Sequence, residues 1–344
     1  MFCIRVDANE IIGTGHVMRC LSIAEEFRIR GESVTFIVAD SRSEKMIVSK
    51  GFQVICLHST WNDLNKEVEG LVRLIETLDI TGLLIDSYYV TETYLRTVRQ
   101  YTKTVYIDDL DAFIYPVDLL VNYNIYAEDL CYTERYQRAG LDTQFALGCS
   151  YAPLREEFSN VNKEINERVS RVLITSGGTD THNAIGNILE ALVKRLWFGE
   201  LEYHIILGRF NVHAKELEEK WRQYENVHLL MNVSNMSEYM RYCDIAITAG
   251  GVTTYELCAC GIPSIMYTLA DNQLQIAQTV SERHLIPWVG DIRGNIENCL
   301  DLIVSYIEKL SDFDRRREMS IKMQEIVDGN GCKRLVDNIV NVLE

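Results

Sequence analysis

Short apolar runs rich in β-branched residues alternate along the first half of the chain with stretches of helical spacing, and this alternation most restricts the possible fold. The runs lie at 34–38, 54–57, 83–85, 105–107, 119–121 and 145–147. Strands that are short and apolar throughout are typical of a parallel sheet covered by helices on both faces. Ligands of such sheets bind beyond the carboxyl ends of the strands. We therefore expect the binding residues in the loops that follow the strands.

The same alternation restarts in the second half, after it lapses in a charged stretch that begins at Tyr151. Further strands are expected at 172–175, 205–207, 227–230, 245–248, 264–267 and 286–289, and helices from near Thr181, at 296–310 and at 315–327. A chain of 344 residues with 47% hydrophobic content is long enough for two domains. The pattern predicts an α/β protein with two doubly wound Rossmann-like domains and a cleft between them, and it resembles the arrangement of type B glycosyltransferases.

The expected boundaries follow from these patterns. The first domain takes residues 1–153, the connection 154–168, the second domain 169–310, and C-terminal helices 311–344. In two-domain folds of this type, a C-terminal helix often crosses back to the first domain. The basic run at 315–317 is expected on a solvated helix face.

The segment 5–31 predicts a strand, a glycine turn and a helix. Gly13 and Gly15 punctuate the turn, and His16 lies at the start of the helix. The first N–H groups of a helix favour negative charge, and glycines let a ligand approach the backbone. A tight turn without a ligand explains the two glycines equally well. A Rossmann dinucleotide site is disfavoured, because Met18 stands where the third glycine of that fingerprint belongs.

Acidic residues follow two of the expected strands of the first half. Asp86 and Tyr88 come after 83–85, and Asp108 and Asp109 come after 105–107. They either gather near His16 or cap the next turn or helix. Adjacent residues point in different directions, so at most one of Asp108 and Asp109 is expected to face the cleft.

The second half carries the candidates for phosphate and ribose binding. Gly250 and Gly251 leave the strand 245–248 and open a helix, so their N–H groups and the hydroxyls of Thr253 and Thr254 predict a pyrophosphate cradle. Glu256 lies one turn into that helix. Its carboxylate either accepts the ribose hydroxyls or offsets the helix dipole.

Charge and composition exclude several classes of function. A net charge of −16 without clustered Lys and Arg excludes nucleic acid as a partner. The ten cysteines form no C-x-x-C pair and are expected as small core residues in a reduced, cytoplasmic compartment. No leader pattern precedes the first strand, and no apolar run approaches the roughly 20 residues that span a bilayer, so no membrane insertion is expected. No metal or other cofactor is expected either, because no metal-ligand spacing joins the histidines His58, His182, His204, His213, His228 and His284.

A set of motifs gives these patterns a chemical meaning. The opening motif R-x-D-x(5)-G-x-G-H-x-x-R-C consists of Arg5, Asp7, Gly13, Gly15, His16, Arg19 and Cys20. It resembles the start of the UDP-sugar hydrolases of the pseudaminic acid pathway, which cleave UDP from a 2,4-diacetamido-2,4,6-trideoxy hexose. The resemblance continues in order over about five-sixths of the chain at 86–88, 107–109, 151–158, 177–180, 249–256 and 272–273. The stretch 249–256 with 272–273 also resembles the nucleotide half of the peptidoglycan N-acetylglucosamine transferase.

The resemblance implies a metal-independent hydrolase that attacks the anomeric carbon with water and inverts its configuration, with sugar and catalysis assigned to the first domain and UDP to the second. His16 is the implied base, since an ordinary imidazole titrates near about 6.5 and is largely neutral yet basic in the cell. Tyr88 and Asn272 would orient the sugar or the water. The implied substrate-binding residues are Arg5, Asp7, Gly13, Gly15, Arg19, Asp109, Arg155, Gly177, Gly178, Asp180, Gly250, Gly251, Thr253, Thr254, Glu256 and Gln273.

Two alternatives stay open at this point. One is a glycosyltransferase of the same architecture that transfers the sugar from UDP to another acceptor. The other is a non-catalytic nucleotide-sugar binding homologue in surface or spore-coat polysaccharide synthesis. The opening motif and the segment around Arg155 favour hydrolysis. Neither the amino sugar nor the oligomeric state follows from the sequence.

Overall fold

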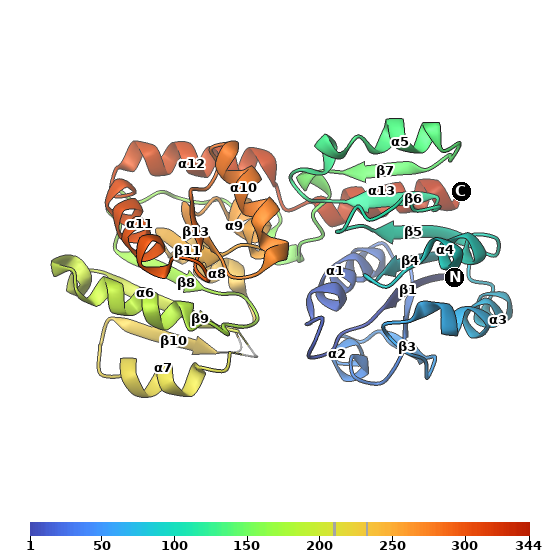
Figure 1. Cartoon of the computed structure of the whole chain (residues 1–344), viewed down its shortest axis with the longest axis horizontal. Coiled ribbons are helices and arrows are strands. Elements are labelled where there is room, and N and C mark those ends of the chain that lie inside the picture. Colours follow the sequence, from blue (N-terminus) through green and yellow to red (C-terminus); the bar gives the residue numbers. More distant parts are fainter. Residues whose placement is uncertain (209–210, 232) are drawn as a thin grey trace. The chain divides into compact units, whose positions relative to one another are not determined.

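The computed structural model describes residues 1–208, 211–231 and 233–344, and it contains two parallel sheets, each in its own unit (Figure 1). Unit 1 comprises Met1–Glu156 and Asn330–Glu344, and unit 2 comprises Glu157–Gly329. These limits differ from the expected boundaries in two ways. Most of the expected connection at 154–168 belongs to unit 2, and the expected C-terminal helices at 311–344 are divided between the units.

Unit 1 is built on a seven-stranded sheet in the order β3-β2-β1-β4-β5-β6-β7. Its strands are β1 (Phe2–Val6), β2 (Val34–Val38), β3 (Gln53–Cys56), β4 (Gly82–Asp86), β5 (Lys103–Ile107), β6 (Leu119–Asn122) and β7 (Gln144–Leu147). Its helices are α1 (Gly15–Ile29), α2 (Glu44–Val48), α3 (Val68–Leu78), α4 (Glu92–Val98), α5 (Tyr132–Arg138) and α13 (Gly331–Leu343). All strand pairs are parallel. The order reverses between β1 and β4, so the loops after these two strands flank the crevice where such sheets bind ligands.

The C-terminal helix α13 returns to unit 1, as is frequent in folds of this type, and two glycines make room for it. A Cβ added at Gly331 would lie 2.0 Å from the carbonyl oxygen of Ala152. A Cβ at Gly82 would lie 2.4 Å from the side chain of Leu343. Only glycine therefore allows α13 to pack this closely against the 149–152 turn and the start of β4.

Unit 2 repeats the same topology with six parallel strands in the order β10-β9-β8-β11-β12-β13. Its strands are β8 (Arg171–Thr175), β9 (Glu202–Leu207), β10 (Val227–Met231), β11 (Ile245–Ala249), β12 (Ser264–Thr268) and β13 (Trp288–Asp291). Its helices are α6 (Ala184–Val193), α7 (Ala214–Trp221), α8 (Met236–Tyr242), α9 (Thr253–Cys260), α10 (Leu274–Glu282), α11 (Ile296–Lys309) and α12 (Phe313–Ile326). Here the order reverses between β8 and β11, which places the loops after these strands at the binding edge.

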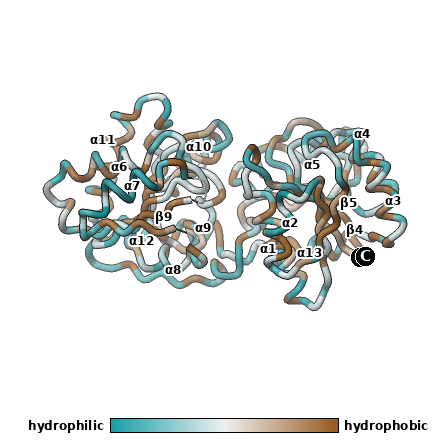
Figure 2. The backbone as a smooth tube through the Cα atoms, turned by 90° about the horizontal axis from the view of Figure 1, so that it is seen from below, coloured by the Kyte–Doolittle hydropathy of each residue, from teal (hydrophilic) through white to brown (hydrophobic). Residues whose placement is uncertain are grey.

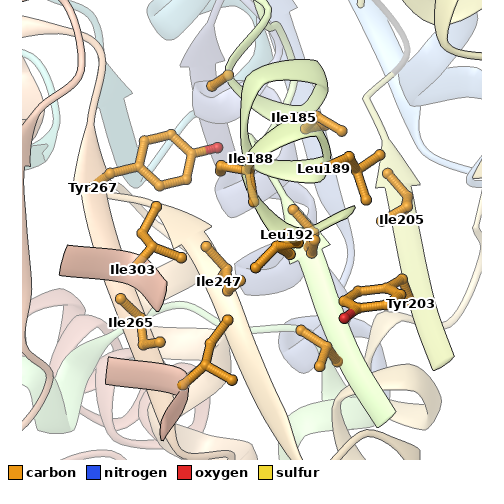
Figure 3. Packing of buried hydrophobic residues seen from close by; sticks show 14 of the residues in the cluster. Ile185, Ile188, Leu189, Leu192, Tyr203, Ile205, Ile247, Ile265, Tyr267 and Ile303 are labelled. Atoms are coloured by element: carbon orange, nitrogen blue, oxygen red, sulfur yellow. The ribbon is translucent and has the colours of Figure 1, made fainter. Parts of the chain in front are cut away.

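The apolar strands are buried between helices in both units. Figure 2 shows hydrophobic residues concentrated along strands such as β4, β5 and β9, and hydrophilic residues along the outer helix α7. In unit 2, Ile188 and Leu192 of α6 point toward Ile247 of β11 and Ile205 of β9, and all four are buried (Figure 3). Burial of each such side chain stabilises the fold by about 1.5–3 kcal/mol.

The basic run at 315–317 is only partly solvated, which corrects the expectation for this helix. Arg316 of α12 is fully buried, and its guanidinium donates to the carbonyl oxygens of Asn166 at 2.8 Å and Glu167 at 2.9 Å. The helix thereby fixes the segment that leads into β8. Within the described residues, no helix combines the length and the apolar character needed to cross a membrane.

Candidate active site

A histidine and an aspartate meet at the point where the strand order of unit 1 reverses. His16 lies in the first turn of α1, and Asp86 is the last residue of β4. Nδ1 of His16 is 2.6 Å from Oδ1 of Asp86, and both side chains are buried. The topology explains the contact, because α1 follows β1 and β1 pairs with β4.

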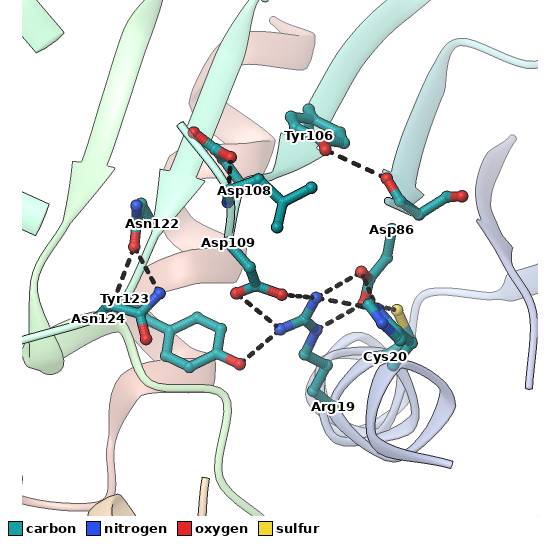
Figure 4. A network of polar contacts seen from close by, with 12 residues as sticks. Arg19, Cys20, Asp86, Tyr106, Asp108, Asp109, Asn122, Tyr123 and Asn124 are labelled. Atoms are coloured by element: carbon teal, nitrogen blue, oxygen red, sulfur yellow. Dashed lines mark hydrogen bonds and ion pairs between the residues drawn. The ribbon is translucent and has the colours of Figure 1, made fainter. Parts of the chain in front are cut away.

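Arg19, one turn further along α1, binds the same carboxylate and a second one (Figure 4). Its Nε donates to Oδ2 of Asp86 at 2.6 Å, and its Nη2 donates to Asp109 at 2.7 Å. The hydroxyl of Tyr123 accepts from Nη1 at 2.6 Å. Burial by itself raises the pKa of Asp86, but the charge of Arg19 and the hydrogen bonds from Arg19 and His16 outweigh it and hold the pKa well below its usual range. Asp86 is therefore a carboxylate at neutral pH.

This charge state decides the tautomer of His16. A carboxylate oxygen 2.6 Å from a ring nitrogen requires a proton between them, and ionised Asp86 has none to give, so Nδ1–H of His16 is the donor. Nη2 of Arg19 also lies 3.0 Å from Nδ1 of His16. With a proton on Nδ1 this contact is not a hydrogen bond, because both nitrogens are donors to the carboxylate of Asp86. In a neutral imidazole with its proton on Nδ1, Nε2 is the nitrogen that carries the lone pair and can accept a proton.

Tyr88 fixes the imidazole from one side. The two rings meet edge to face with centroids 4.4 Å apart. Tyr88 is 37% exposed, so it can also contact a ligand. Burial and the negative charge of Asp109 raise the pKa of Tyr88, which keeps its hydroxyl protonated as a donor. Cys20 adds a thiol 3.5 Å from Asp86, and burial raises the pKa of this thiol as well.

Asp108 and Asp109 point in different directions, as expected. Asp108 is fully buried, accepts from the backbone N–H groups of Leu110 and Asp111, both at 2.9 Å, and receives the hydroxyl of Tyr132 at 2.6 Å. It therefore caps the turn after β5, whereas Asp109 faces Arg19 (Figure 4).

Arg5 and Asp7, two of the implied substrate-binding residues, lie inside the unit and bind other residues of the chain. Arg5 is fully buried, and its guanidinium contacts both oxygens of Glu67 at 2.7 and 2.8 Å and Asp7 at 2.5 Å. The other oxygen of Asp7 accepts from the N–H of Ala39 at 2.8 Å. These residues join the end of β1 to β2 and to the start of α3, and so position the loop that precedes His16.

Gly13 and Gly15 leave the backbone open, as a ligand site at this turn requires. Gly13 has a φ of +71°, and a Cβ at either glycine would meet nothing within 4 Å. The side chain of Asn9 shapes the loop by accepting from the N–H groups of Ile11 and Ile12 at 2.9 and 3.1 Å. The loop therefore has a fixed shape and an accessible backbone.

The predicted phosphate cradle of unit 2 is smaller than expected. The N–H of Gly250 donates to the carbonyl oxygen of Tyr267 at 2.9 Å and so belongs to the sheet. Thr254 is fully buried, and its hydroxyl has no hydrogen-bond partner within the described part of the chain. Gly251, with a φ of +125°, starts the turn into α9, where Thr253 and Glu256 are partly exposed in the first turn. Of the residues predicted to bind phosphate and ribose at the start of α9, Gly251, Thr253 and Glu256 thus stay accessible.

The other predicted site residues of unit 2 lie in the loops after β8 and β12, and they differ in exposure and in hydrogen bonding. A Cβ at Gly250 would lie 3.2 Å from Cβ of Gln273, so the loops after β11 and β12 touch. The side-chain oxygen of Gln273 accepts a hydrogen bond from the N–H of Leu269 at 2.9 Å. Asn272 is exposed. Gly177, with a φ of +78°, and Gly178 form the turn after β8.

Asp180 and Arg155 complete the residues implied by the resemblance. Asp180 is fully buried and accepts from the N–H groups of Ala184 and Ile185 at 2.7 and 3.1 Å, so its carboxylate caps α6. Arg155 is half-buried in unit 1. Tyr123 is the site residue that the sequence did not single out. Asp86, expected after the strand 83–85 either to gather near His16 or to cap the next turn, lies at His16.

The strand register of unit 2 places two of the histidines together. His204 lies opposite His228, next to Glu202, although the spacing of the histidines along the sequence predicts no metal site. Ligands from neighbouring strands leave no short spacing motif, so the sequence could not reveal this group.

Known proteins resemble the chain in both sequence and fold. Residues 171–285 match the model of the glycosyltransferase family 28 C-terminal domain. An uncharacterised protein of Methanocaldococcus jannaschii is 27% identical over 299 residues, which are 82% of this chain and 59% of that protein. The chain therefore spans about three-fifths of the length of this relative.

Two further relatives have names that refer to carbohydrate metabolism. The spore coat polysaccharide biosynthesis protein SpsG of Bacillus subtilis is 22% identical, with 96% of this chain and 95% of that protein covered. The UDP-2,4-diacetamido-2,4,6-trideoxy-beta-L-altropyranose hydrolase of Campylobacter jejuni is 26% identical, with 69% and 80% covered.

Among solved structures, Acinetobacter baumannii MurG superposes with a TM-score of 0.72 over 99% of both chains at 13% identity. This likeness and the two doubly wound sheets confirm the predicted type B glycosyltransferase fold.

Proposed function

We propose that the protein hydrolyses a UDP-activated 2,4-diacetamido-2,4,6-trideoxy hexose, releasing UDP by inverting attack of water on the anomeric carbon. The observation that carries the proposal is the contact of Nδ1 of His16 with ionised Asp86, which leaves Nε2 as a base. The name of the Campylobacter jejuni relative supports this substrate class.

In the proposed reaction, Nε2 of His16 removes a proton from water while the water oxygen bonds to the anomeric carbon. The bond between that carbon and the diphosphate oxygen breaks, and UDP leaves with the electron pair. Asp86 stabilises the imidazolium that forms, and the proton passes from His16 to solvent before the next cycle. Tyr88 holds the imidazole ring in place and supplies a donor for the sugar.

Unit 2 is proposed to bind the nucleotide. The backbone at Gly251 and the N-terminus of α9 would receive the diphosphate, because helix N-termini favour anions. Glu256 would accept the ribose hydroxyls, and Asn272 would contact the sugar. Backbone donors of this kind stabilise a departing diphosphate electrostatically, so we propose that the reaction needs no metal ion.

A glycosyltransferase is the second candidate, and the family 28 match favours it. The same His16 can deprotonate an acceptor hydroxyl in place of water, so the groups around His16 do not separate the two reactions. The difference lies in the nucleophile, and the products identify it.

The experiment is UDP release from a panel of UDP-amino sugars in ¹⁸O-water, with and without candidate acceptors. A hydrolase of this mechanism releases UDP without an acceptor, and the UDP carries no ¹⁸O because the bond to carbon breaks. His16→Asn should reduce the rate by about 100- to 10,000-fold, the usual contribution of a general base, and keep UDP affinity. His284→Asn, a matched change in unit 2, should keep the rate.

Three results would contradict the proposal. UDP release only in the presence of an acceptor would identify a transferase. UDP affinity by calorimetry without release over hours would identify a binding protein. Retention of most activity by His16→Asn would exclude His16 as the base.

A further inference from the structure

Three side chains with metal-binding atoms converge on one face of the unit 2 sheet, near the amino ends of β9 and β10. His204 and His228 are paired in register on these neighbouring strands, and their ring centroids lie 4.9 Å apart. Glu202 shares the face of His204 because it lies two residues before it in β9. One ligand atom from each residue lies within 4.8 Å of the other two.

A buried ring nitrogen of His204 without a hydrogen-bond partner points to a ligand. The residue is only 9% exposed, and its Nε2 has no hydrogen-bond partner among the residues that the structure describes. The nearest anionic atom, Oε2 of Glu202, lies 3.7 Å from it, which is beyond hydrogen-bond distance. Buried polar atoms are normally satisfied, because leaving one unpaired costs free energy.

Packing alone does not explain this arrangement. The ring of His204 also lies near Tyr239 and Tyr242 of α8, with centroid distances of 6.4 and 5.3 Å. These contacts explain why the ring is buried. They do not supply a hydrogen-bond partner for its Nε2, which lies 3.7 Å from the carboxylate of Glu202.

We propose that Glu202, His204 and His228 bind one zinc ion, with water as the fourth ligand. A tetrahedral zinc ion with bonds of about 2.0–2.1 Å holds its nitrogen and oxygen ligands about 3.4 Å apart. The separation of 3.7 Å between Glu202 and His204 approaches this value, and the ligand atoms of all three residues lie within 4.8 Å, so the side chains would rotate inward to bind the ion. Two imidazoles select a transition metal, since magnesium and calcium require oxygen ligands.

The surrounding charge leaves the site available to a cation. Arg171 of β8 faces this group, and its guanidinium stacks on the ring of Tyr242 at 4.1 Å. The same guanidinium lies 4.0 Å from the carboxylate of Asp244. Asp244 therefore offsets part of its charge.

The place of the site in the fold assigns it a structural role. β10 is an edge strand that pairs only with β9. The ligands lie near the amino ends of the strands, whereas the turn after β8 and the start of α9 lie at the carboxyl ends. Zinc would clamp the edge strand to its neighbour and stabilise unit 2 without entering the reaction. The inference is independent of the proposed function.

The test is zinc titration of the full chain after treatment with a chelator. We expect one zinc equivalent in calorimetry and a rise in the thermal transition, because a ligand that binds only the folded state stabilises it. Glu202→Gln and His228→Gln should each weaken zinc binding at least tenfold and reduce the thermal shift. Both positions are more exposed than His204, so these variants keep the fold testable. His213→Gln, a histidine near Glu216 and outside the group, should bind zinc like the wild type.

Cobalt distinguishes this site from a cysteine site. Cys56 and His58 lie 3.5 Å apart in unit 1 and are the competing pair, so the titration is repeated with Cys56→Ser. Cobalt bound by Glu202 and two imidazoles gives d–d bands without thiolate charge transfer. Thiolate charge transfer, loss of binding in Cys56→Ser, or unchanged binding in both Glu202→Gln and His228→Gln would overturn the inference. So would the absence of zinc binding.

Discussion

Oδ1 of Asp86 lies 2.6 Å from Nδ1 of His16, and the other oxygen of the same carboxylate receives Nε of Arg19 at 2.6 Å. One carboxylate at the end of β4 thus orients a histidine and an arginine that are one turn apart on α1. Because the whole group is buried, the charge of Asp86 depends on its two partners, and each member depends on the others for its orientation.

Asp86→Asn should reduce UDP release by about 100- to 10,000-fold with little change in UDP affinity. The amide keeps the shape but can donate to Nδ1 of His16, which favours the wrong tautomer. The measurement is kcat and KM for UDP release, with UDP affinity by calorimetry.

Asp118→Asn is the matched control. Asp118 also binds an arginine, Arg99, but it caps the start of β5, away from His16. We expect this variant to lose stability and to keep its kcat. Equal kcat losses in both variants would mean that Asp86 acts only through stability.

Arg19→Met should lower the free energy of unfolding of unit 1 by about 3–5 kcal/mol, the usual cost of removing one partner from a buried ion pair. Asp86 and Asp109 would then face each other without a cation. Urea denaturation measures the change. Arg28→Met removes an exposed pair with Glu25 on the same helix and should cost less than about 1 kcal/mol. Similar losses for both variants would show that Arg19 contributes no more than a surface arginine.

The fold could be predicted from the sequence because buried strands of a parallel sheet are short runs of apolar residues, and such runs are visible locally. The expected strand at 34–38 coincides with β2, and the expected strand at 286–289 differs from β13 (Trp288–Asp291) by two residues. The helix expected from near Thr181 begins at Ala184. Asn183 takes a left-handed conformation with a φ of 49°, and Asp180 caps the helix across this turn.

The candidate site was predictable only where local signals exist. His16 follows two glycines at a helix start, and this is visible in the sequence. Arg5 is neutralised by Glu67, 62 residues away, and this pairing depends on tertiary structure. The same holds for His204 and His228, which meet only through the register of β9 and β10.

Glu256→Ala should weaken UDP binding by about 1.5–3 kcal/mol, the range for hydrogen bonds to a charged group. The reason is the loss of the proposed ribose contacts, and calorimetry with UDP measures it. Glu297→Ala removes a first-turn carboxylate from α11 and controls for the helix dipole. If Glu256→Ala leaves UDP affinity unchanged, Glu256 only offsets the dipole of α9.

Lys163 should make the stability of unit 2 depend on pH. Its ammonium group donates to the carbonyl oxygens of Met240, Arg241 and Cys243 at the C-terminal end of α8. Burial outweighs these contacts and the charge of Asp244 and lowers the pKa of Lys163 from 10.5 to about 8. Between these two values the unfolded chain keeps the proton that the folded chain has lost. Stability then rises with pH, by at most about 1.4 kcal/mol per pH unit. Below pH 8 both states are protonated, and the lysine contributes no slope.

Lys163→Met isolates this contribution because it removes the titrating group. The difference in free energy of unfolding, wild type minus variant, should be constant from pH 6 to about 7 and should increase from about pH 8 toward 10. Urea unfolding followed by tryptophan fluorescence measures it, since Trp221 is buried in unit 2. A difference that stays constant across this whole range, or that decreases as the pH rises, would show that the folded chain holds the proton of Lys163 as firmly as the unfolded chain does.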